Sequence, residues 1–317
     1  MSYCVDPLKF KGVCHFTTTD IINNIELNLK LRLDWSMLKI GGFINVVKGM
    51  PGPSDIGDWS KLKPVDDDGY RWISIRKEWV YENVDYTDVD SNVVSPSSPI
   101  IYVDDVIIPS SEYSINYAEG MVIFDDPVDL SAVVQAVHSY RYVQTYISSD
   151  VPWWRELQQK SFDLTDIHFE QSTCGDWNIG SQHRVQMPTI IIDAIPTGSL
   201  SGYALGESQR KAYQGVLFHI FAETKAIRNR LVDIIRLQGE TAICTFNANY
   251  AALDSALPFT CDDSQTGLDY SGLVDEYPWH KIWLGKPLIR DLNTLKCGLY
   301  EAKVDIPVEV TFVDCGV

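Results

Sequence analysis

One short stretch of the sequence holds side chains that could carry out hydrolytic chemistry. The segment "DLTDIH" contains Asp163, Asp166 and His168. Two carboxylates beside an imidazole can bind metal ions or activate water, so a binuclear or hydrolytic site is one interpretation. The simpler interpretation is a solvated loop or strand edge, because a chain rich in Asp and Glu brings such groups together by chance. We therefore predict no catalytic residue here.

The sequence lacks the familiar catalytic and cofactor-binding patterns. In "GSLSG", Leu200 stands where the nucleophile elbow of a hydrolase needs serine. The "GK" before Pro287 has no phosphate-binding loop ahead of it. The "HFE" that begins at His168 matches the H-x-E of zinc deaminases, but no P-C-x-x-C follows it. These observations predict a protein that is not an enzyme and that has no catalytic residue, metal site or cofactor.

Aromatic side chains are abundant enough to suggest carbohydrate binding. The chain contains 9 Trp and 16 Tyr residues, and exposed rings can stack on sugars. The candidate stacking platforms are Trp153, Trp154, Trp177, Trp279 and Trp283. Aromatic residues are also favoured in β-strands and at protein interfaces. A receptor- or glycan-binding protein therefore stays as the alternative function, and exposed, coplanar Trp rings would favour it.

The composition bounds the class of protein. The 317 residues are enough for two domains, and 45% of them are hydrophobic. A net charge of -17 disfavours a protein that reads the sequence of duplex DNA. The 7 cysteines are scattered and include no C-x-x-C pair, which favours a reducing compartment. The sequence has no signal-peptide core and no run of about 18 apolar residues, so we expect a soluble protein made in a cytoplasm.

Residues 1–150 are predicted to form a β-rich domain with one N-terminal helix. The segment that follows Thr18 shows both the alternation of a strand and the stripe of a helix. We favour the helix, because Thr18 or Thr19 can cap it and Gly41 and Gly42 can end it. Its apolar stripe consists of Ile22, Ile25, Leu29, Leu33 and Met37.

A turn-rich stretch at residues 103–129 predicts a self-contained β-hairpin module of three short strands. Asp104 and Asp105 form its first turn. The module carries no His, Cys or Lys, so it offers no nucleophile, no base near neutral pH and no metal cluster. We predict that it contacts another protein chain. The predicted contact residues are Tyr113, Tyr117 and Glu119.

Residues 151–317 are predicted to form an α+β domain in which one amphipathic helix packs on an antiparallel sheet. A short helix is expected after Pro152. The further expected elements are a strand at 186–196, a glycine-bearing loop at 197–211, a strand at 212–223, a helix at 224–239, a strand at 241–247 and a β arm at 302–313.

The helix from Thr224 to Gly239 has an apolar stripe and a basic face. The stripe that should pack on the sheet consists of Ile227, Leu231, Ile234 and Ile235. The polar face carries Lys225, Arg228, Arg230 and Arg236 against the single acidic residue Asp233. A solvated surface is one explanation of this face. The other is an acidic neighbour, which in a self-assembling ring is a further copy of the chain.

The second half resembles the tail-terminator and tail-completion proteins of tailed bacteriophages. The residues that carry the resemblance are "MPTIIIDAIP" and "GYALGESQRKAYQGVLFHIFAETKAIRNRLVDIIRLQ". They are similar to that family in the succession of a strand, an "LG" loop, a second strand and a helix with Arg and Asp on its outer face. Ala222 and Glu223 match the small and acidic residues that end the family's second strand. The hairpin module also looks like β pieces of phage neck, baseplate and appendage proteins.

The resemblance implies a structural protein of the virion, in the neck or at the head–tail junction. Its expected partners are further copies of the chain in a hexameric ring and other neck or tail proteins, with no membrane. Genomic DNA would pass through an acidic lumen without specific binding. The expected location is the virion, after assembly in the host cytoplasm. Terminator, stopper and other neck or baseplate roles are all compatible with the sequence.

Overall fold

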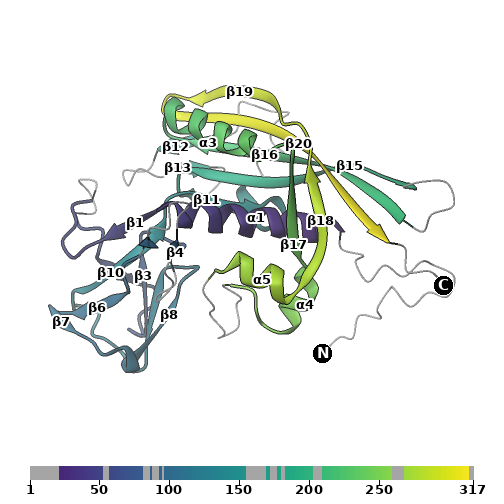
Figure 1. Cartoon of the computed structure of the whole chain (residues 1–317). Helices are drawn as coiled ribbons and strands as arrows, with labels where there is room; N and C mark the ends of the chain where they lie inside the picture. The colour runs from purple at the N-terminus through teal and green to yellow at the C-terminus, as the bar shows by residue number, and fades with distance from the viewer. Residues whose placement is uncertain are drawn as a thin grey trace.

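The protein has a mixed α+β fold with mostly antiparallel sheets, which confirms the coarse fold class (Figure 1). The computed structural model describes residues 21–52, 57–80, 86–87, 93–94, 96–154, 169–171, 177–179, 183–202, 209–258 and 268–313. Asp163, Asp166 and His168, and most of the helix expected after Pro152, lie outside these residues.

Two small sheets form an N-terminal β unit. The first has the order β1 (Phe43–Val46), β10 (Val134–Arg141), β6 (Ile100–Val103) and β7 (Val106–Ile107). The second has the order β2 (Leu62–Pro64), β3 (Arg71–Ser74), β9 (Met121–Phe124) and β8 (Tyr113–Asn116). Their shared core includes Trp72, Trp79, Ile101, Val122 and Ala136.

The predicted hairpin module is not self-contained, because its strands belong to both of these sheets. Its first turn is confirmed: Asp104 and Asp105 have φ values of 47° and 68°, the conformation that a tight two-residue hairpin turn requires. Strand β7 pairs with β6, whereas β8 and β9 pair with each other in the second sheet. The module is therefore divided by long-range strand pairing that its local pattern does not reveal.

A seven-stranded sheet dominates the rest of the molecule. Its order is β11 (Gln144–Ile147), β15 (Thr189–Gly202), β16 (Gln209–Ala222), β20 (Leu299–Val313), β18 (Pro278–Leu284) and β17 (Thr241–Phe246), and β19 (Leu288–Lys296) also pairs with β20. Only β11 and β15 among these paired strands run parallel. Smaller pairings join β4 (Tyr86–Thr87) to β5 (Val93–Val94), and β13 (Trp177–Ile179) to β12 (Phe169–Gln171) and β14 (His183–Val185).

The glycine-bearing loop predicted at 197–211 is mostly strand. Residues 198–202 of β15 pair with residues 210–214 of β16, so the two strands form one long hairpin. Glycine composition favours a loop locally. Here the pairing with the long strand β16 outweighs that local preference, so these residues form a strand.

Helices α1 (Ile21–Lys39) and α3 (Lys225–Leu237) pack on the same face of this sheet, α1 against β11 and β15 and α3 against β16 and β20 (Figure 1). The predicted α1 helix is confirmed. Its Leu29 and Leu33 share a core with Phe218 of β16. Ile22 is 49% exposed and does not belong to the buried stripe.

The mixed periodicity of α1 has a structural cause, since the helix is buried on two sides. Leu31 and Leu38 are 3% and 1% exposed and pack against α4 (Ala248–Leu253) and α5 (Tyr270–Glu276). In Figure 1, α1 crosses the molecule with α3 above it and α4 and α5 below it. A helix with apolar residues on opposite sides gives alternation as well as a helical stripe.

The division of the chain at residue 150 stays a prediction. Two elements that precede this boundary, α1 and β11, are built into the C-terminal sheet: α1 shares its core, and β11 pairs with β15. The N-terminal β unit has a separate core, which lies to the lower left in Figure 1.

Candidate assembly surface

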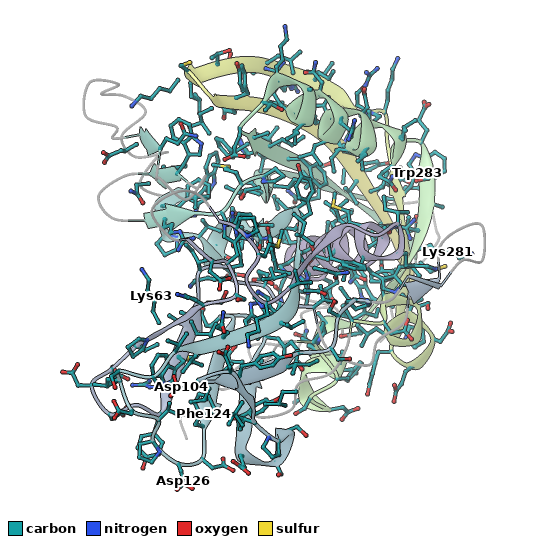
Figure 2. All side chains as sticks on the ribbon, turned by 90° about the vertical axis from the view of Figure 1, so that its left-hand side faces the viewer. Lys63, Asp104, Phe124, Asp126, Lys281 and Trp283 are labelled. Carbon is teal, nitrogen blue, oxygen red and sulfur yellow. The ribbon has the colours of Figure 1, made fainter. Side chains whose placement is uncertain are left out.

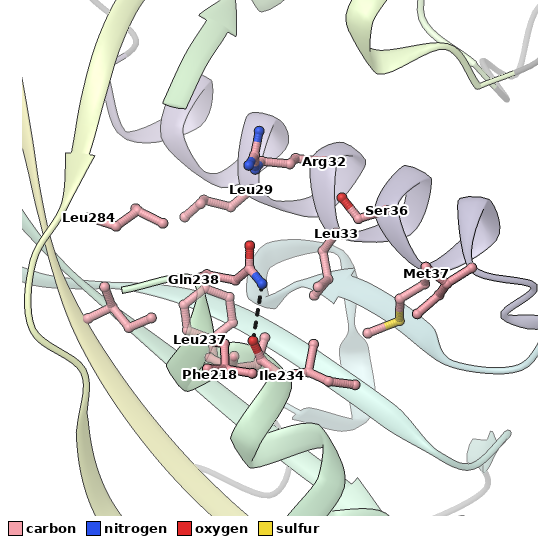
Figure 3. Close-up of a pocket in the computed structure, with 13 residues that line it drawn as sticks. Leu29, Arg32, Leu33, Ser36, Met37, Phe218, Ile234, Leu237, Gln238 and Leu284 are labelled. Carbon is pink, nitrogen blue, oxygen red and sulfur yellow. Dashed lines mark hydrogen bonds between the residues drawn. The ribbon is translucent and has the colours of Figure 1, made fainter. Parts of the chain in front are cut away.

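An apolar groove lies between α1 and α3 on the helical face of the sheet (Figure 3). Its volume is about 280 Å³. The walls come from α1 and α3, and the floor comes from β16, β18 and β20. The lining residues are Leu29, Arg32, Leu33, Ser36, Met37, Ile40, Phe218, Ile234, Ile235, Leu237, Gln238, Leu284 and Ile306.

Two large apolar side chains at the groove are strongly exposed. Leu237 at the end of α3 is 78% exposed, and Ile40 just after α1 is 64% exposed. Few lining groups are polar. Arg32 is the only charged one, and Gln238 donates through Nε2 to the carbonyl oxygen of Ile234 at 3.2 Å. Exposed apolar side chains around an apolar groove are typical of a protein-docking site.

The helix that forms one groove wall begins as the sequence predicts. Thr224 caps α3, because its Oγ1 accepts a hydrogen bond from the Ile227 amide at 3.2 Å. Leu231 and Ile235 are buried against the sheet, and Ile227 and Ile234 are half-buried against the same core. These contacts confirm the predicted stripe.

The predicted basic face of α3 needs one correction. Lys225, Arg230 and Arg236 are exposed. Arg228 is only 3% exposed. Its Nη1 donates to the carbonyl oxygen of Asn293 in β19 at 3.2 Å, so its long side chain lies along the sheet instead of facing solvent.

The predicted contact residues of the hairpin are mostly engaged within the chain. Tyr117 is 4% exposed, and Tyr113 makes an edge contact with Phe124 at 6.3 Å between ring centroids. Glu119 is exposed, but its carboxylate pairs with Lys77. The structure therefore does not bring these residues together with the basic residues of α3, which lie in a different part of the molecule (Figure 1).

The hairpin tip is also held by backbone hydrogen bonds. The amide of Glu78 donates to the carbonyl oxygen of Ala118 at 3.0 Å, and that of Ser74 donates to Gly120 at 2.8 Å. These bonds make the tip part of the N-terminal β unit. Contact with another chain through the hairpin stays a prediction.

Strand β19 lies at an edge of the sheet, and its sequence does not set it apart from the neighbouring strands. Within the described residues, β19 pairs with β20 alone. Its Leu288, Leu292 and Leu295 are 50%, 51% and 36% exposed. An edge strand that exposes leucines is suited to pairing with a further chain. Its place at the edge depends on pairing with distant segments, which the local sequence does not reveal.

Most of the candidate sugar platforms are buried. Trp153, Trp154 and Trp177 are 6%, 5% and 1% exposed, and the first two rings meet at 82°. Trp279 packs against the main core. Trp283 is 46% exposed, and Figure 2 shows it on β18 beside Lys281, across the view from Asp104 and Asp126.

Trp283 belongs to a row of side chains on the outer face of the sheet. Strand register places it opposite Glu309, which in turn lies opposite Tyr213. Tyr213 is 39% exposed. The Lys211 ammonium pairs with the Glu309 carboxylate between the two rings. The row combines two aromatic rings with an ammonium and a carboxylate group, which can form hydrogen bonds with the hydroxyl groups of a sugar.

One buried cluster pairs a histidine with carboxylates. His219 is 4% exposed; its Nε2 lies 4.0 Å from Asp193 and its Nδ1 lies 3.9 Å from Glu301. Burial works to raise the pKa of Glu301, but the interactions with His219 and with the charge of Lys303 outweigh it and lower that pKa. The Trp154 ring covers the histidine at 4.1 Å. We interpret the cluster as structural, because it is closed to solvent.

No protein family model and no curated protein matches the sequence. Across the part of the chain that the structure describes, no helix is long and apolar enough to span a membrane. In the same part, no group of three or more His, Cys, Asp or Glu side chains is arranged to hold a metal ion.

Proposed function

We propose that this chain is a structural subunit of a tailed-bacteriophage virion, and that copies of it form a ring in the neck or at the head–tail junction. The observation that carries the proposal is the open apolar groove, with exposed Ile40 and Leu237 at its rim. A surface of this kind is stabilised when a partner covers it. The exposed edge of β19 provides a second surface for pairing.

The arrangement around α3 supports a tail-terminator-like role. The chain passes from β15 through β16 and α3 to β17, and α3 packs on an antiparallel part of the sheet. The sequence of this chain resembles that of tail-terminator proteins in the same succession of elements. A terminator or tail-completion protein is therefore the role we favour, and a hexameric ring is the expected assembly.

The charge distribution is compatible with a ring around DNA. The chain carries a net charge of -17, whereas α3 exposes Lys225, Arg230 and Arg236. Basic surfaces buried between subunits would leave a mainly acidic lumen, which repels the phosphate backbone and allows DNA to pass.

Mass measurement tests this function directly. We expect the purified chain, alone or with tail components, to form a closed oligomer of one defined size, and we expect antibodies to find it in purified particles. The protein should show no turnover of nucleotides, glycans or peptides. A chain that stays monomeric under all these conditions and is absent from particles would refute the proposal. So would hydrolysis that is lost on replacing Asp166 and His168 by alanine.

A receptor- or glycan-binding appendage protein is the second candidate, and the row of Trp283, Glu309 and Tyr213 favours it. Adjacent strands are about 4.8 Å apart, so two rings separated by one strand lie about 10 Å apart, a span suited to an oligosaccharide. Glycan-array binding that Trp283→Ala abolishes would support this function. Absence of glycan binding by the assembled protein would exclude it.

A further inference from the structure

We propose that the groove between α1 and α3 receives the exposed end of α4 from a second copy of this chain. The inference rests on the proposed function, since it names the partner that covers the groove in the assembly. It joins two features of one chain: an unfilled apolar groove, and an apolar projection of matching size.

The projection is formed by Tyr250 and Leu253. They are 52% and 78% exposed, although both belong to a helix whose Ala248 and Ala251 are buried. Asn247 fixes the start of α4, because its Oδ1 accepts from the Tyr250 amide at 3.3 Å. The helix is therefore ordered before binding, which lowers the entropy cost of docking.

The groove has the size and chemistry to take these side chains. An apolar cavity of about 150 Å³ accommodates benzene. A groove of about 280 Å³ therefore has room for the ring of Tyr250 and the isobutyl group of Leu253. Leu237 at the rim would be covered at the same time.

The charges beside the projection and the groove are opposite. Exposed Asp254 directly follows Leu253, and Arg32 is the one charged residue of the groove wall. Copies of a chain with a net charge of -17 repel each other at long range. Contacts between them are favoured where a basic site meets an acidic one, and this pairing also fixes the orientation of docking.

The contact must form between two molecules, because α1 separates the two features. Helix α4 packs on the flank of α1 that carries Leu31 and Leu38, and the groove lies on the other flank. Figure 1 shows α4 below α1 and α3 above it. A docked pair keeps a free projection on one copy and a free groove on the other, so this head-to-tail contact produces a ring or a filament.

Two variants that block opposite sides of the contact test the inference. Leu253→Asp removes the projection, and Ser36→Trp fills the groove from the α1 wall. Each should weaken self-association at least about 30-fold, the effect of losing an interface hot spot. Circular dichroism and thermal melting check that both variants fold. Ile22→Asp is the matched control, since it alters an exposed residue of α1 that does not line the groove.

Mixing the variants gives the decisive result. Leu253→Asp keeps an intact groove and Ser36→Trp keeps an intact projection, so an equimolar mixture should form a one-to-one heterodimer that grows no further. Native mass spectrometry distinguishes the two chains. The inference is overturned if either folded variant assembles like the wild type, or if the mixture stays monomeric. Assembly and particle incorporation that survive Leu253→Asp would leave the proposed function intact and refute only this contact.

Discussion

The two flanks of α1 differ in how completely they are covered. On the flank that faces α4 and α5, Leu31 and Leu38 are almost fully buried. On the flank that faces α3, the groove leaves Ile40 and Leu237 in solvent. One flank is an ordinary core, and the other is a surface that lacks a partner. The difference shows that the sequence of α1 encodes one packed flank and one open flank, and the open flank is the one for which we propose docking.

The closed flank is also tied by hydrogen bonds. Asn28 Nδ2 donates to the Phe246 carbonyl oxygen at 2.9 Å, and its Oδ1 accepts from the Phe246 amide at 3.0 Å and from the Tyr270 hydroxyl at 3.0 Å. Asn24 Oδ1 accepts from the Ala248 amide at 2.8 Å. These side chains satisfy backbone groups at the end of β17 and the start of α4, as a packed interior requires.

The largest expected effect concerns the residues that hold α3 beside the groove. Leu231→Ala should lower the free energy of unfolding by about 2–5 kcal/mol, because Leu231 is buried against the sheet. Leu237→Ala on the same helix should change it by less than about 0.5 kcal/mol, since that side chain is exposed. Denaturant unfolding measures both values. Equal losses in the two variants would contradict the distinction between packed and open sides.

A smaller loss is expected from the closed flank. Asn28→Ala should destabilise the fold by about 2–4 kcal/mol, because buried groups of Phe246 and Tyr270 lose their partner. Ser36→Ala, in the wall of the groove, should be nearly neutral. A neutral Asn28→Ala variant would show that the closed flank does not depend on these hydrogen bonds.

The sequence predicts the helices better than it predicts their surroundings. The stripe and cap of α3 follow from local spacing, and Leu231, Ile235 and Thr224 behave as predicted. The groove could not be predicted, because it forms where α1 meets α3, about two hundred residues later in the chain. The burial of the Arg228 side chain likewise depends on its hydrogen bond to Asn293 of the distant strand β19. Of the candidate contact residues, Glu119 and those of α3 other than Arg228 are exposed, whereas Tyr117 and Arg228 are buried.

The effect that is smallest near neutral pH tests whether the N-terminal β unit is independent of both flanks. His138 stacks on Trp79 at 3.9 Å, and burial lowers its pKa from 6.5 to about 3. Between these two values the unfolded chain binds a proton that the folded chain does not. The stability that depends on neutral His138 is therefore complete above pH 6.5 and falls as the pH decreases, by about 1.4 kcal/mol per pH unit.

A His138→Phe variant removes this titration and keeps an aromatic ring against Trp79. As the pH decreases below 6.5, the unfolding free energy of the wild type should fall relative to that of the variant. Self-association through the groove should be the same in both proteins at pH 7.5. A difference that does not change with pH would contradict the buried, neutral state of His138.

Photo-crosslinking from the projection tests the account of the open flank most directly. A Leu253→p-benzoylphenylalanine variant is mixed in heavy and light isotopic forms, irradiated after assembly and mapped by mass spectrometry. We predict crosslinks between heavy and light chains that fall within residues 36–40 and 234–238. The same group in place of Ile22 should give no crosslink there. Crosslinks from position 253 that reach other surfaces, or that stay within one chain, would contradict the account.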